Sequence, residues 1–494
     1  MKNEKTMFDR FGEYADARPD EQFIFDERRT FTVREAFSTS CRIADELTAA
    51  GVRPESRVVL RCTRTVDACL IYYALQFVGA AAVLTDPHDG AEEFISKSGI
   101  SFSEHFTVTD EANSGRFMLT TADGTEKELK ISPPPRGYTR AFEPHADAHT
   151  LSTVVFTSGS TGKNKAVMLS QDNILKISTA TLELGRYRRG DRAIVAIPFH
   201  HVFGLSLVTT ALVAKYSLFF PRTTELDDML ENIEKYKITR MNGVPSLYLA
   251  MARANEKAKR DLSSLGTGFI GGAPVTEEQF RYIEKALGVT MLPVYGMSEC
   301  IGIACSSYQD DVAARAATNG RFYSMSRGFI LDERGNELPQ GAEGEVCVTS
   351  PAVMLGYYGD PQSTAEAIDE HNRLHTGDLG FVDGDGRLHI SGRKKDIIIR
   401  NGVNISAVKI ESAILSVSGV AYAAAVGIKH DGYGEVPCAL VVGDISESEL
   451  RAALHDRLEK NEMPERIAFA DAMPFTNTGK PDKQKIKEMF SDER

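Results

Sequence analysis

Several features that mark common protein classes are missing from this sequence. Its seven cysteines form no CxxC pair, so a zinc framework and a disulfide framework are both unfavourable. There is no long run of lysine and arginine, and the formal net charge is −12, which argues against nucleic acid or anionic membrane as the main partner. The N-terminus lacks a signal-peptide pattern, and the most apolar window, 69–84, is shorter than a bilayer span. We therefore expect a cytoplasmic protein with free thiols and no transmembrane segment.

The length and the order of segments predict more than one domain. At 494 residues the chain exceeds one compact core. Alternating strand and helix patterns predict an α/β fold, with a large multi-layer N-terminal domain of parallel and mixed sheets over residues 1–392. After GRKK at 392–395 the pattern changes to a small α+β module over residues 397–494. The expected boundary between the two domains is 393–396.

A loop rich in Thr, Ser, Gly and Lys follows a strand pattern, in FTSGSTGKNK at 156–165. Such a loop can form an anion-binding nest, because successive backbone N–H groups point at phosphate oxygens and glycine lets the backbone approach them. A Walker A loop needs four residues between its first glycine and its Gly-Lys-Ser/Thr end. Here only Ser160 and Thr161 separate Gly159 from Gly162, which disfavours a P-loop protein. Taken alone, the loop is also compatible with a solvated turn.

Nine segments, in order along the chain, together resemble the adenylate-forming superfamily of acyl-CoA synthetases, peptide-synthetase adenylation domains and luciferases. They are FTSGSTGKNKAVMLS (156–170), IPFHHVFGL (197–205), MNGVPSLY (241–248), IGGAP (270–274), VYGMSE (294–299), GEVCVTSPAVMLGYY (344–358), HTGDLG (375–380), GRKKDIIIRNGVNIS (392–406) and PFTNTGK (474–480). The resemblance implies an AMP-forming acid–thiol ligase. A carboxylate attacks the α-phosphorus of ATP to give acyl-AMP and pyrophosphate, and the thiol of CoA then displaces AMP. The implied cofactors are ATP, Mg²⁺ and CoA.

The same resemblance implies the residues that bind ATP. The phosphate loop comprises Thr157, Ser158, Gly159, Ser160, Thr161, Gly162 and Lys165. The remaining ATP-binding positions are Gly272, Ala273, Pro274, Tyr295, Gly296, Met297, Ser298, Asp378 and Arg393. Among these, Tyr295 offers an aromatic face to the purine, and Asp378 accepts hydrogen bonds from the ribose hydroxyls. Glu299 is the expected Mg²⁺ ligand, because Mg²⁺ prefers carboxylate oxygen.

Residues of the small domain are assigned roles in the two half-reactions. By resemblance, Lys480 is the catalytic lysine that bridges the carboxylate and the α-phosphate during adenylation. Lys395 matches the hinge position within 393–396, about which the mobile small domain swings, and Gly402 matches the glycine beside the pantetheine arm of CoA. Adenylation and thioester formation are thus expected to use different domain arrangements.

The acid is expected to be fatty or aromatic. Members of the family that activate amino acids usually carry an Asp near the FHHVFGLS segment, and this chain offers no carboxylate there. His201 is expected to gate the channel between nucleotide and acid as well as to pack in it. The predicted acyl pocket comprises His201, Met241, Asn242, Gly243, Ile270, Gly271 and Ile303. The segment DIIIRNGVNIS resembles CoA ligases more than luciferase, which disfavours luciferase-type oxidation.

Two alternatives remain open at this point. An acyl carrier protein could replace CoA as acceptor, since both end in the same phosphopantetheine arm. A non-catalytic nucleotide-binding protein is the alternative of another class, supported by Ala166, where the family usually has glycine, and by Pro481. The matches at Glu299, Asp378 and Lys480 argue against this second alternative.

Overall fold

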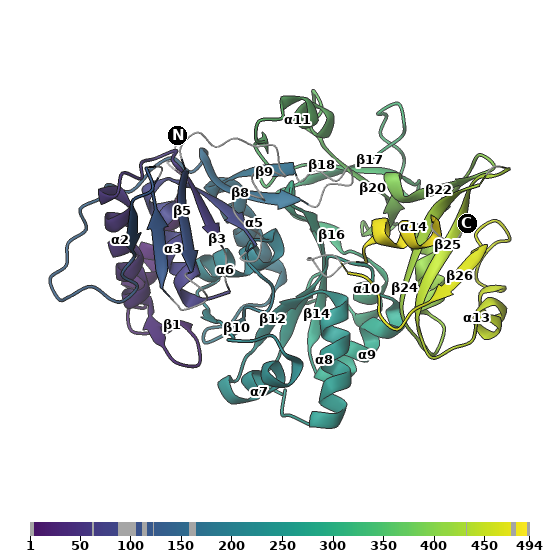
Figure 1. Cartoon of the computed structure of the whole chain (residues 1–494), viewed down its shortest axis with the longest axis horizontal. Coiled ribbons are helices and arrows are strands. Elements are labelled where there is room, and N and C mark those ends of the chain that lie inside the picture. Colours follow the sequence, from purple (N-terminus) through teal and green to yellow (C-terminus); the bar gives the residue numbers. More distant parts are fainter. Residues whose placement is uncertain are drawn as a thin grey trace.

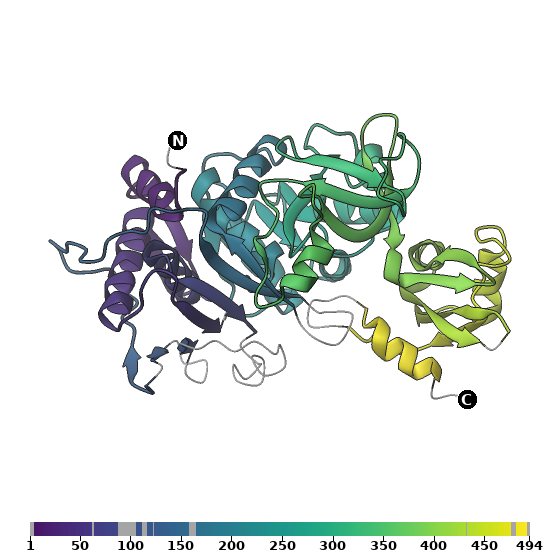
Figure 2. The same ribbon diagram turned by 90° about the horizontal axis from the view of Figure 1, so that it is seen from above.

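The computed structural model describes residues 4–61, 64–86, 105–110, 116–121, 123–157, 165–430, 432–475 and 481–491. Two large sheets with their helices and one smaller sheet form the main body of the molecule (Figure 1). The chain beyond about residue 400 forms a separate module at one end, as both views show (Figure 2). This arrangement confirms the predicted fold class.

The first large sheet has a parallel centre. Its order is β16-β15-β14-β13-β12-β10-β11-β1-β2, and the pairings from β1 through β11, β10, β12 and β13 to β14 are parallel. The bounds are β1 Gln22–Phe25, β2 Thr30–Thr32, β10 Arg192–Ile194, β11 Ser217–Phe219, β12 Arg240–Gly243, β13 Thr267–Ile270, β14 Thr290–Met297, β15 Cys300–Cys305 and β16 Arg321–Phe322. The carboxyl ends of these parallel strands are where a ligand is expected.

The second large sheet is mixed and has the order β19-β9-β8-β4-β3-β5-β6-β7. Its bounds are β3 Arg57–Arg61, β4 Ala81–Thr85, β5 His105–Asp110, β6 Phe117–Thr120, β7 Glu126–Glu128, β8 Leu151–Thr157, β9 Lys165–Ser170 and β19 Gly356–Tyr357. β3 and β4 are parallel, as the predicted βαβ order requires, and β8 pairs antiparallel with β9. The predicted phosphate loop therefore connects two neighbouring strands.

Helices fill the space between the large sheets and cover the outer face of the first. One apolar core joins residues of α1 (Met7–Ala17), α2 (Val33–Ala49), α3 (Val66–Val78), α5 (Gln171–Leu184) and α6 (Val202–Ala214) with strand residues of both sheets. A second core lies under α7 (Leu226–Tyr236), α8 (Pro245–Ala258) and α9 (Glu277–Leu287), and α10 (Val312–Ala317) packs beside it. All of α3 is buried, as its apolar sequence predicts.

The third sheet and the small domain meet at a short segment. The third sheet has the order β17-β18-β20-β21, with β17 Arg327–Leu331, β18 Gly344–Thr349, β20 Leu374–Val382 and β21 Leu388–Arg393; α11 (Pro361–Ala367) precedes β20. A 3-10 helix, η2 (Lys394–Asp396), leads into the small domain. That domain contains β22 Ile397–Arg400, β23 Val403–Ser406, β24 Val420–His430, β25 Gly434–Gly443 and β26 Arg466–Phe469, with α12 Ala407–Leu415, α13 Glu447–Leu454 and α14 Lys483–Ser491. The third sheet ends at Arg393 and the next sheet begins at Ile397, and the domain boundary at 393–396 stays a prediction.

Local signals in the sequence account for several of these elements. Thr32 and Glu35 form the predicted capping box at the start of α2, directly after the β1–β2 hairpin. Ser446 and Glu449 form a second one at the start of α13. Among the described residues, no helix combines the length and the hydropathy that crossing a membrane would require.

Candidate active site

A cavity of about 640 Å³ lies where the two large sheets, the third sheet and η2 approach one another. Its walls come from residues far apart in the sequence. From the N-terminal half they are Phe156, Thr157, Lys165, Ile177, Thr181, Tyr187, Ile197, His201, Val202, Phe203, Ser206, Leu207, Thr210, Tyr216, Asn242 and Val244. From the remainder they are Phe269, Gly271, Gly272, Val294, Gly296, Met297, Ser298, Glu299, Ile301, Tyr323, Glu345, Tyr357, Glu366, His375, Thr376, Gly377, Asp378, Arg393, Lys394 and Lys395. The wall where Asp378 pairs with Arg393 and Glu345 pairs with Lys394 is called the polar end below, and the wall with the stacked rings of Tyr187 and Tyr216 is called the apolar end.

Asp378 is held in place on the wall of the polar end. It is 4% exposed, and it lies opposite Arg393 in the β20–β21 pairing. Its Oδ2 accepts a hydrogen bond of 2.7 Å from the hydroxyl of Tyr295, and its Oδ1 lies 2.8 Å from Arg393 Nε. Burial and the Asp378 charge raise the pKa of Tyr295, so this hydroxyl stays protonated as a donor. A carboxylate has about four acceptor positions, so two remain for neighbouring hydroxyls of a ligand.

A second buried carboxylate, Glu299, lies near the start of the phosphate loop. It is 7% exposed, and its Oε1 accepts a 2.7 Å hydrogen bond from the hydroxyl of Tyr357. Lys165 Nζ lies 4.7 Å from the centroid of the Tyr357 ring, and Thr157 is the register partner of Lys165. A buried carboxylate with one oxygen directed by a tyrosine, beside a lysine, fits a site for Mg²⁺ and phosphate oxygens. The residues present therefore suit the metal that the sequence predicts.

Glycines give the wall between these carboxylates a flat backbone surface. Gly272 has a φ of +86°, a conformation that other residues adopt with strain. A Cβ placed on Gly296 would lie 2.5 Å from the carbonyl oxygen of Ile301. Gly272, Gly296, Met297 and Ser298 all line the cavity, whereas Ala273 and Pro274 follow outside the lining. The surface suits a flat ring placed against the backbone.

Cations from η2 and the end of β21 close the polar end. Arg393, Lys394 and Lys395 all line the cavity. Lys394 Nζ lies 3.0 Å from Glu345 Oε2. Partial burial, together with the nearby Arg393 guanidinium, lowers the pKa of Lys395. These neighbouring positive charges repel one another, and a polyphosphate bound beside them would offset that repulsion.

A lysine in α14, the C-terminal helix of the small domain, forms an ion pair with η2. Lys483 Nζ lies 2.9 Å from Glu411 Oε1 and 3.4 Å from Asp396 Oδ2. Burial disfavours the charge of Lys483, but the two carboxylates outweigh burial and raise its pKa. The first residue of α14 is therefore joined to the predicted hinge by an ion pair.

Comparison with known proteins agrees with this arrangement. The AMP-binding enzyme family matches residues 11–358, and the AMP-binding enzyme C-terminal domain matches residues 409–480. This chain belongs to the AMP-binding enzyme family. Feruloyl-CoA synthase from an Amycolatopsis species is 30% identical over 91% of this chain and 92% of its own length. The long-chain-fatty-acid–CoA ligase FadD13 of Mycobacterium tuberculosis is 27% identical over 94% of each chain.

Solved structures of the family share the whole fold. The crystal structure of ATP-bound MatB from Rhodopseudomonas palustris superposes with a TM-score of 0.85, at 26% identity over 99% of both chains. The amide bond synthetase McbA from Marinactinospora thermotolerans gives a TM-score of 0.83 at 26% identity, over 98% of this chain and 99% of that one. Together with the CoA ligases above, the family confirms the predicted AMP-forming ligase. The non-catalytic alternative is not supported.

The structure brings together much of the nucleotide site that the sequence predicts. Thr157, Lys165, Asp378, Arg393 and Glu299 converge on one cavity from five different segments. Tyr295 lies behind the wall and supports Asp378 instead of lining the cavity. Two predicted groups, Lys480 and the loop positions Ser158, Gly159, Ser160, Thr161 and Gly162, lie outside the described residues. The ATP-binding roles themselves remain predictions.

Gly402 lies away from this cavity. It occupies the turn between β22 and β23, where Asn401 and Gly402 both have positive φ, of 54° and 76°. Such a two-residue turn matches the twist of the hairpin. A Cβ added to Gly402 would meet nothing within 4 Å. Its predicted role beside the pantetheine arm therefore requires a different domain arrangement from the one described here.

The cavity lining includes only part of the predicted acyl pocket, whose role stays a prediction. His201, Asn242 and Gly271 line the cavity, but Met241, Gly243, Ile270 and Ile303 do not. Side chains alternate between the two faces of a strand, so Met241 and Ile270 point into the core beneath α7 and α8 while their neighbours Asn242 and Gly271 face the cavity. Ile303 is fully buried in the core between the large sheets.

Sequence reasoning missed most of the apolar wall. Its residues come from α5, the loop before β10, α6, the residue before β11, β13 and the loop after β16, and all of them except Phe203 lie outside the recognised motifs. They include Ile177, Thr181, Tyr187, Phe203, Ser206, Leu207, Thr210, Tyr216, Phe269 and Tyr323. The only available signal was the helical spacing of Phe203, Ser206, Leu207 and Thr210, which places one face of α6 along the cavity.

The Asp378 geometry makes a testable prediction about ATP affinity. The substitution Asp378→Asn keeps the size of the side chain but removes the charged acceptor. It should cost about 1.5 to 3 kcal/mol of ATP-binding free energy, which raises the dissociation constant roughly 10- to 150-fold. We expect isothermal titration with ATP to show this loss. The matched control is Asp383→Asn, a partly exposed residue after the same strand that pairs with His389, and it should bind ATP normally. Equal affinities for both variants would contradict the assignment.

Proposed function

We propose that this chain is an ATP-dependent acyl-CoA ligase whose acid is a compact aromatic or other ring-bearing monocarboxylic acid. The observation that carries the acid class is the apolar end of the cavity. Tyr187, Tyr216 and Tyr323 line it together with the hydroxyl side chains of Ser206 and Thr210. Aromatic walls favour stacked or edge-on rings, and interspersed hydroxyls can bond to ring substituents.

The charge distribution around the cavity favours one carboxylate in the substrate. The charged lining residues belong to the polar end, where the nucleotide and the reacting carboxylate would meet. Among the described lining residues, none at the apolar end carries a full charge. The nearby Arg240 lies behind Tyr187, with its guanidinium 3.9 Å from the ring centroid, and it pairs with Asp191 at 3.2 Å. A second carboxylate or an ammonium group would therefore lack a partner there.

The far end of the cavity has rigid walls, which favours a ring over a long chain. The rings of Tyr187 and Tyr216 stack with an interplanar angle of 3° and a centroid distance of 5.7 Å. Arg240 packs behind Tyr187, and the hydroxyl of Tyr216 donates to the backbone carbonyl of Leu207. Both tyrosines are thus fixed by contacts with neighbouring protein groups. A long alkyl chain would have to displace this stack.

Adenylation requires little more than positioning and charge stabilisation, because the substrate carboxylate is already a nucleophile. Asp378 would orient the ribose, and Lys165 and Arg393 would hold phosphate oxygens. Glu299 would hold Mg²⁺, which neutralises charge on the phosphates when bound. Lys480 would approach the reacting carboxylate and the α-phosphate from the small domain. The pyrophosphate leaves with its electron pair as the acyl–oxygen–phosphorus bond forms.

Thioester formation requires the pantetheine thiol to reach the acyl carbon. We propose CoA as acceptor, in line with the relatives named as CoA ligases. We also propose that rotation about Lys395 moves Lys480 away from the active site and brings the Gly402 turn to it. The thiol sulfur then forms the new bond to the acyl carbon, and AMP departs with the former carboxylate oxygen. We also place the protein in the cytoplasm, since six described cysteines are unpaired thiols, which a reducing compartment maintains.

The acid class can be tested with a panel of carboxylates. The panel contains hydroxycinnamic and benzoic acids, medium- and long-chain fatty acids, a dicarboxylic acid and an amino acid, each with Mg-ATP and either CoA or a holo acyl carrier protein. We expect kcat/KM to be highest for a ring acid with CoA and negligible for the dicarboxylic and amino acids. A preference for a long-chain fatty acid would contradict the acid class, and a preference for the carrier protein would contradict the acceptor.

The roles of the small domain can be tested in separate half-reactions. Lys480→Ala should nearly abolish acyl-AMP formation but preserve the conversion of supplied acyl-AMP and CoA to thioester. Lys485→Ala is its control, because Lys485 is 65% exposed on the same C-terminal segment. Lys395→Pro should show the reverse pattern, since proline fixes φ and opposes rotation there. Lys395→Ala removes the same amine without that restriction and should retain more thioester formation.

Single-turnover assays of each half-step, with circular dichroism to confirm folding, provide the measurement. An equal loss of both half-reactions in folded Lys480→Ala and Lys395→Pro proteins would exclude alternation between domain arrangements.

A further inference from the structure

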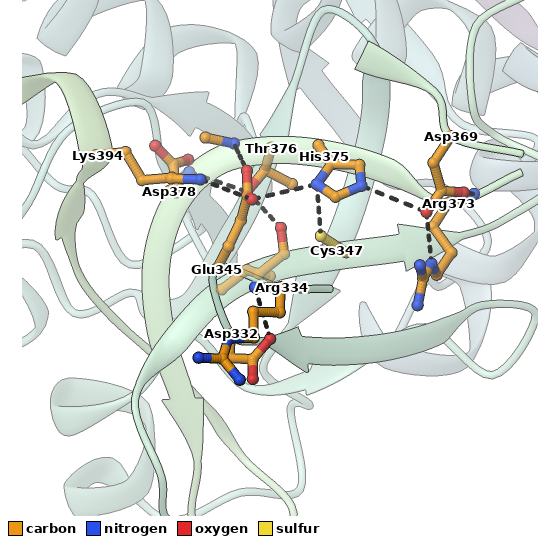
Figure 3. Close-up of polar contacts among 12 residues, drawn as sticks. Asp332, Arg334, Glu345, Cys347, Asp369, Arg373, His375, Thr376, Asp378 and Lys394 are labelled. Atoms are coloured by element: carbon orange, nitrogen blue, oxygen red, sulfur yellow. Dashed lines mark hydrogen bonds and ion pairs between the residues drawn. The ribbon is translucent and has the colours of Figure 1, made fainter. Parts of the chain in front are cut away.

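Three side chains with metal-binding atoms lie on one face of the third sheet. Glu345 and Cys347 are two residues apart in β18, on either side of an irregularity in the pairing with β20, and their ligand atoms lie within 4.8 Å of each other. Cys347 is the direct register partner of His375 in the neighbouring strand β20. Figure 3 shows the three side chains converging, with Glu345 between Lys394 and His375. The pairing of two strands thus brings together three potential metal ligands that the spacing of cysteines in the sequence does not predict.

The distances within this trio resemble those of a metal site. His375 Nδ1 lies 3.4 Å from Cys347 Sγ and 3.1 Å from Glu345 Oε2. All three ligand atoms lie within 4.8 Å of one another. Tetrahedral coordination with bonds of about 2.0 to 2.3 Å separates neighbouring ligand atoms by roughly 3.3 to 3.6 Å. An ion could therefore be accommodated with shifts of a few tenths of an ångström.

A second carboxylate fixes the orientation of the histidine. Asp369 Oδ2 lies 3.3 Å from His375 Nε2 and accepts a 2.7 Å hydrogen bond from Arg373 Nε. Asp369 Oδ1 accepts from the backbone N–H groups of His371 and Arg373. With an ion bound, an acceptor at Nε2 would keep the proton on that nitrogen and leave the lone pair of Nδ1 for the ion. Histidines that bind zinc commonly have such a carboxylate behind them.

The site is open on the side of the nucleotide. Glu345 and His375 line the large cavity, and Cys347 is buried behind them. Three protein ligands with one open position suit an ion that also takes water or a ligand oxygen. A thiol and an imidazole favour zinc and related transition metals, whereas Mg²⁺ prefers oxygen ligands throughout. This ligand set differs in kind from the predicted Mg²⁺ position at Glu299.

We propose that Glu345, Cys347 and His375 form a binding site for a single zinc-class divalent ion on the wall of the cavity. On binding, the Cys347 thiol releases its proton to solvent and the sulfur forms a bond to the ion. The ion also displaces the ammonium group of Lys394, which occupies Glu345 Oε2 at 3.0 Å. The other carboxylate oxygen keeps its 3.1 Å hydrogen bond from the backbone N–H of Gly377. Because Lys394 begins η2, the ion competes directly with a tether to the predicted hinge.

The experiment is a titration of chelator-treated, full-length protein with Co²⁺, followed by absorption spectroscopy. We expect one Co²⁺ per chain, with a thiolate-to-cobalt charge-transfer band and the visible bands of a tetrahedral ion, both removed by one equivalent of Zn²⁺. Cys347→Ser should lose the charge-transfer band. The control Cys438→Ser, at a buried cysteine of the small domain, should retain it. Absence of the band from the unsubstituted protein, or its persistence in Cys347→Ser, would overturn the proposal.

Lys394→Ala distinguishes a metal site from a hydrogen-bonded network that never binds metal. Removal of the competing ammonium should lower the dissociation constant for Co²⁺ by about fivefold, the equivalent of one partly exposed ion pair. A purely structural role for the trio predicts no such gain. An unchanged affinity would show that the ion does not use Glu345 and would overturn the assignment. If Cys347→Ser does not fold, His375→Asn replaces it, and unchanged Co²⁺ affinity in that variant would be equally decisive. These measurements read metal binding directly, so they stand independently of ligase activity.

Discussion

The pairing of β20 with β21 is the constraint on which the active site depends. This register places Asp378 of β20 opposite Arg393 of β21. The carboxylate predicted to hold the ribose is thus fixed against the last strand before the small domain. A shift of one residue would turn Asp378 to the opposite face of the sheet. Because Lys394 and Lys395 follow directly, the nucleotide end of the cavity and the predicted hinge share one short segment. The predicted ribose carboxylate and the predicted hinge are thereby linked through the same short stretch of backbone.

The polar end of the cavity holds a group of cations in a protein that is negatively charged as a whole. A chain with a net charge of −12 must offer a polyphosphate a local group of cations. Lys165, Arg393, Lys394 and Lys395 provide this group, and the lowered pKa of Lys395 reflects partial burial and a cationic neighbour. An anionic ligand favours the charged form of such a lysine. The ion pair of Lys394 with Glu345 joins one end of η2 to the third sheet, and that of Asp396 with Lys483 joins the other end to α14.

The sequence predicts the nucleotide end of the site better than the acyl end, for a physical reason. Glu299, Asp378 and Arg393 lie in contiguous segments whose polar residues are recognisable one motif at a time. The acyl wall depends on how α6 packs against the strands and on which strand face a residue occupies, so Asn242 faces the cavity while the adjacent Met241 faces the core. The Glu345, Cys347 and His375 trio likewise requires the β18–β20 register. Capping boxes and the βαβ order, which are local, are predicted correctly.

The central claim is that the acid passes through an acyl-adenylate, and isotopic oxygen tests it most directly. The protein is incubated with Mg-ATP, CoA and a ring acid whose carboxylate carries ¹⁸O, and the products are analysed by mass spectrometry. Attack of the carboxylate on the α-phosphorus, followed by cleavage of the acyl carbon–oxygen bond, predicts that AMP acquires one ¹⁸O per turnover. Formation of ADP, or appearance of the label in inorganic phosphate with unlabelled AMP, would contradict the account.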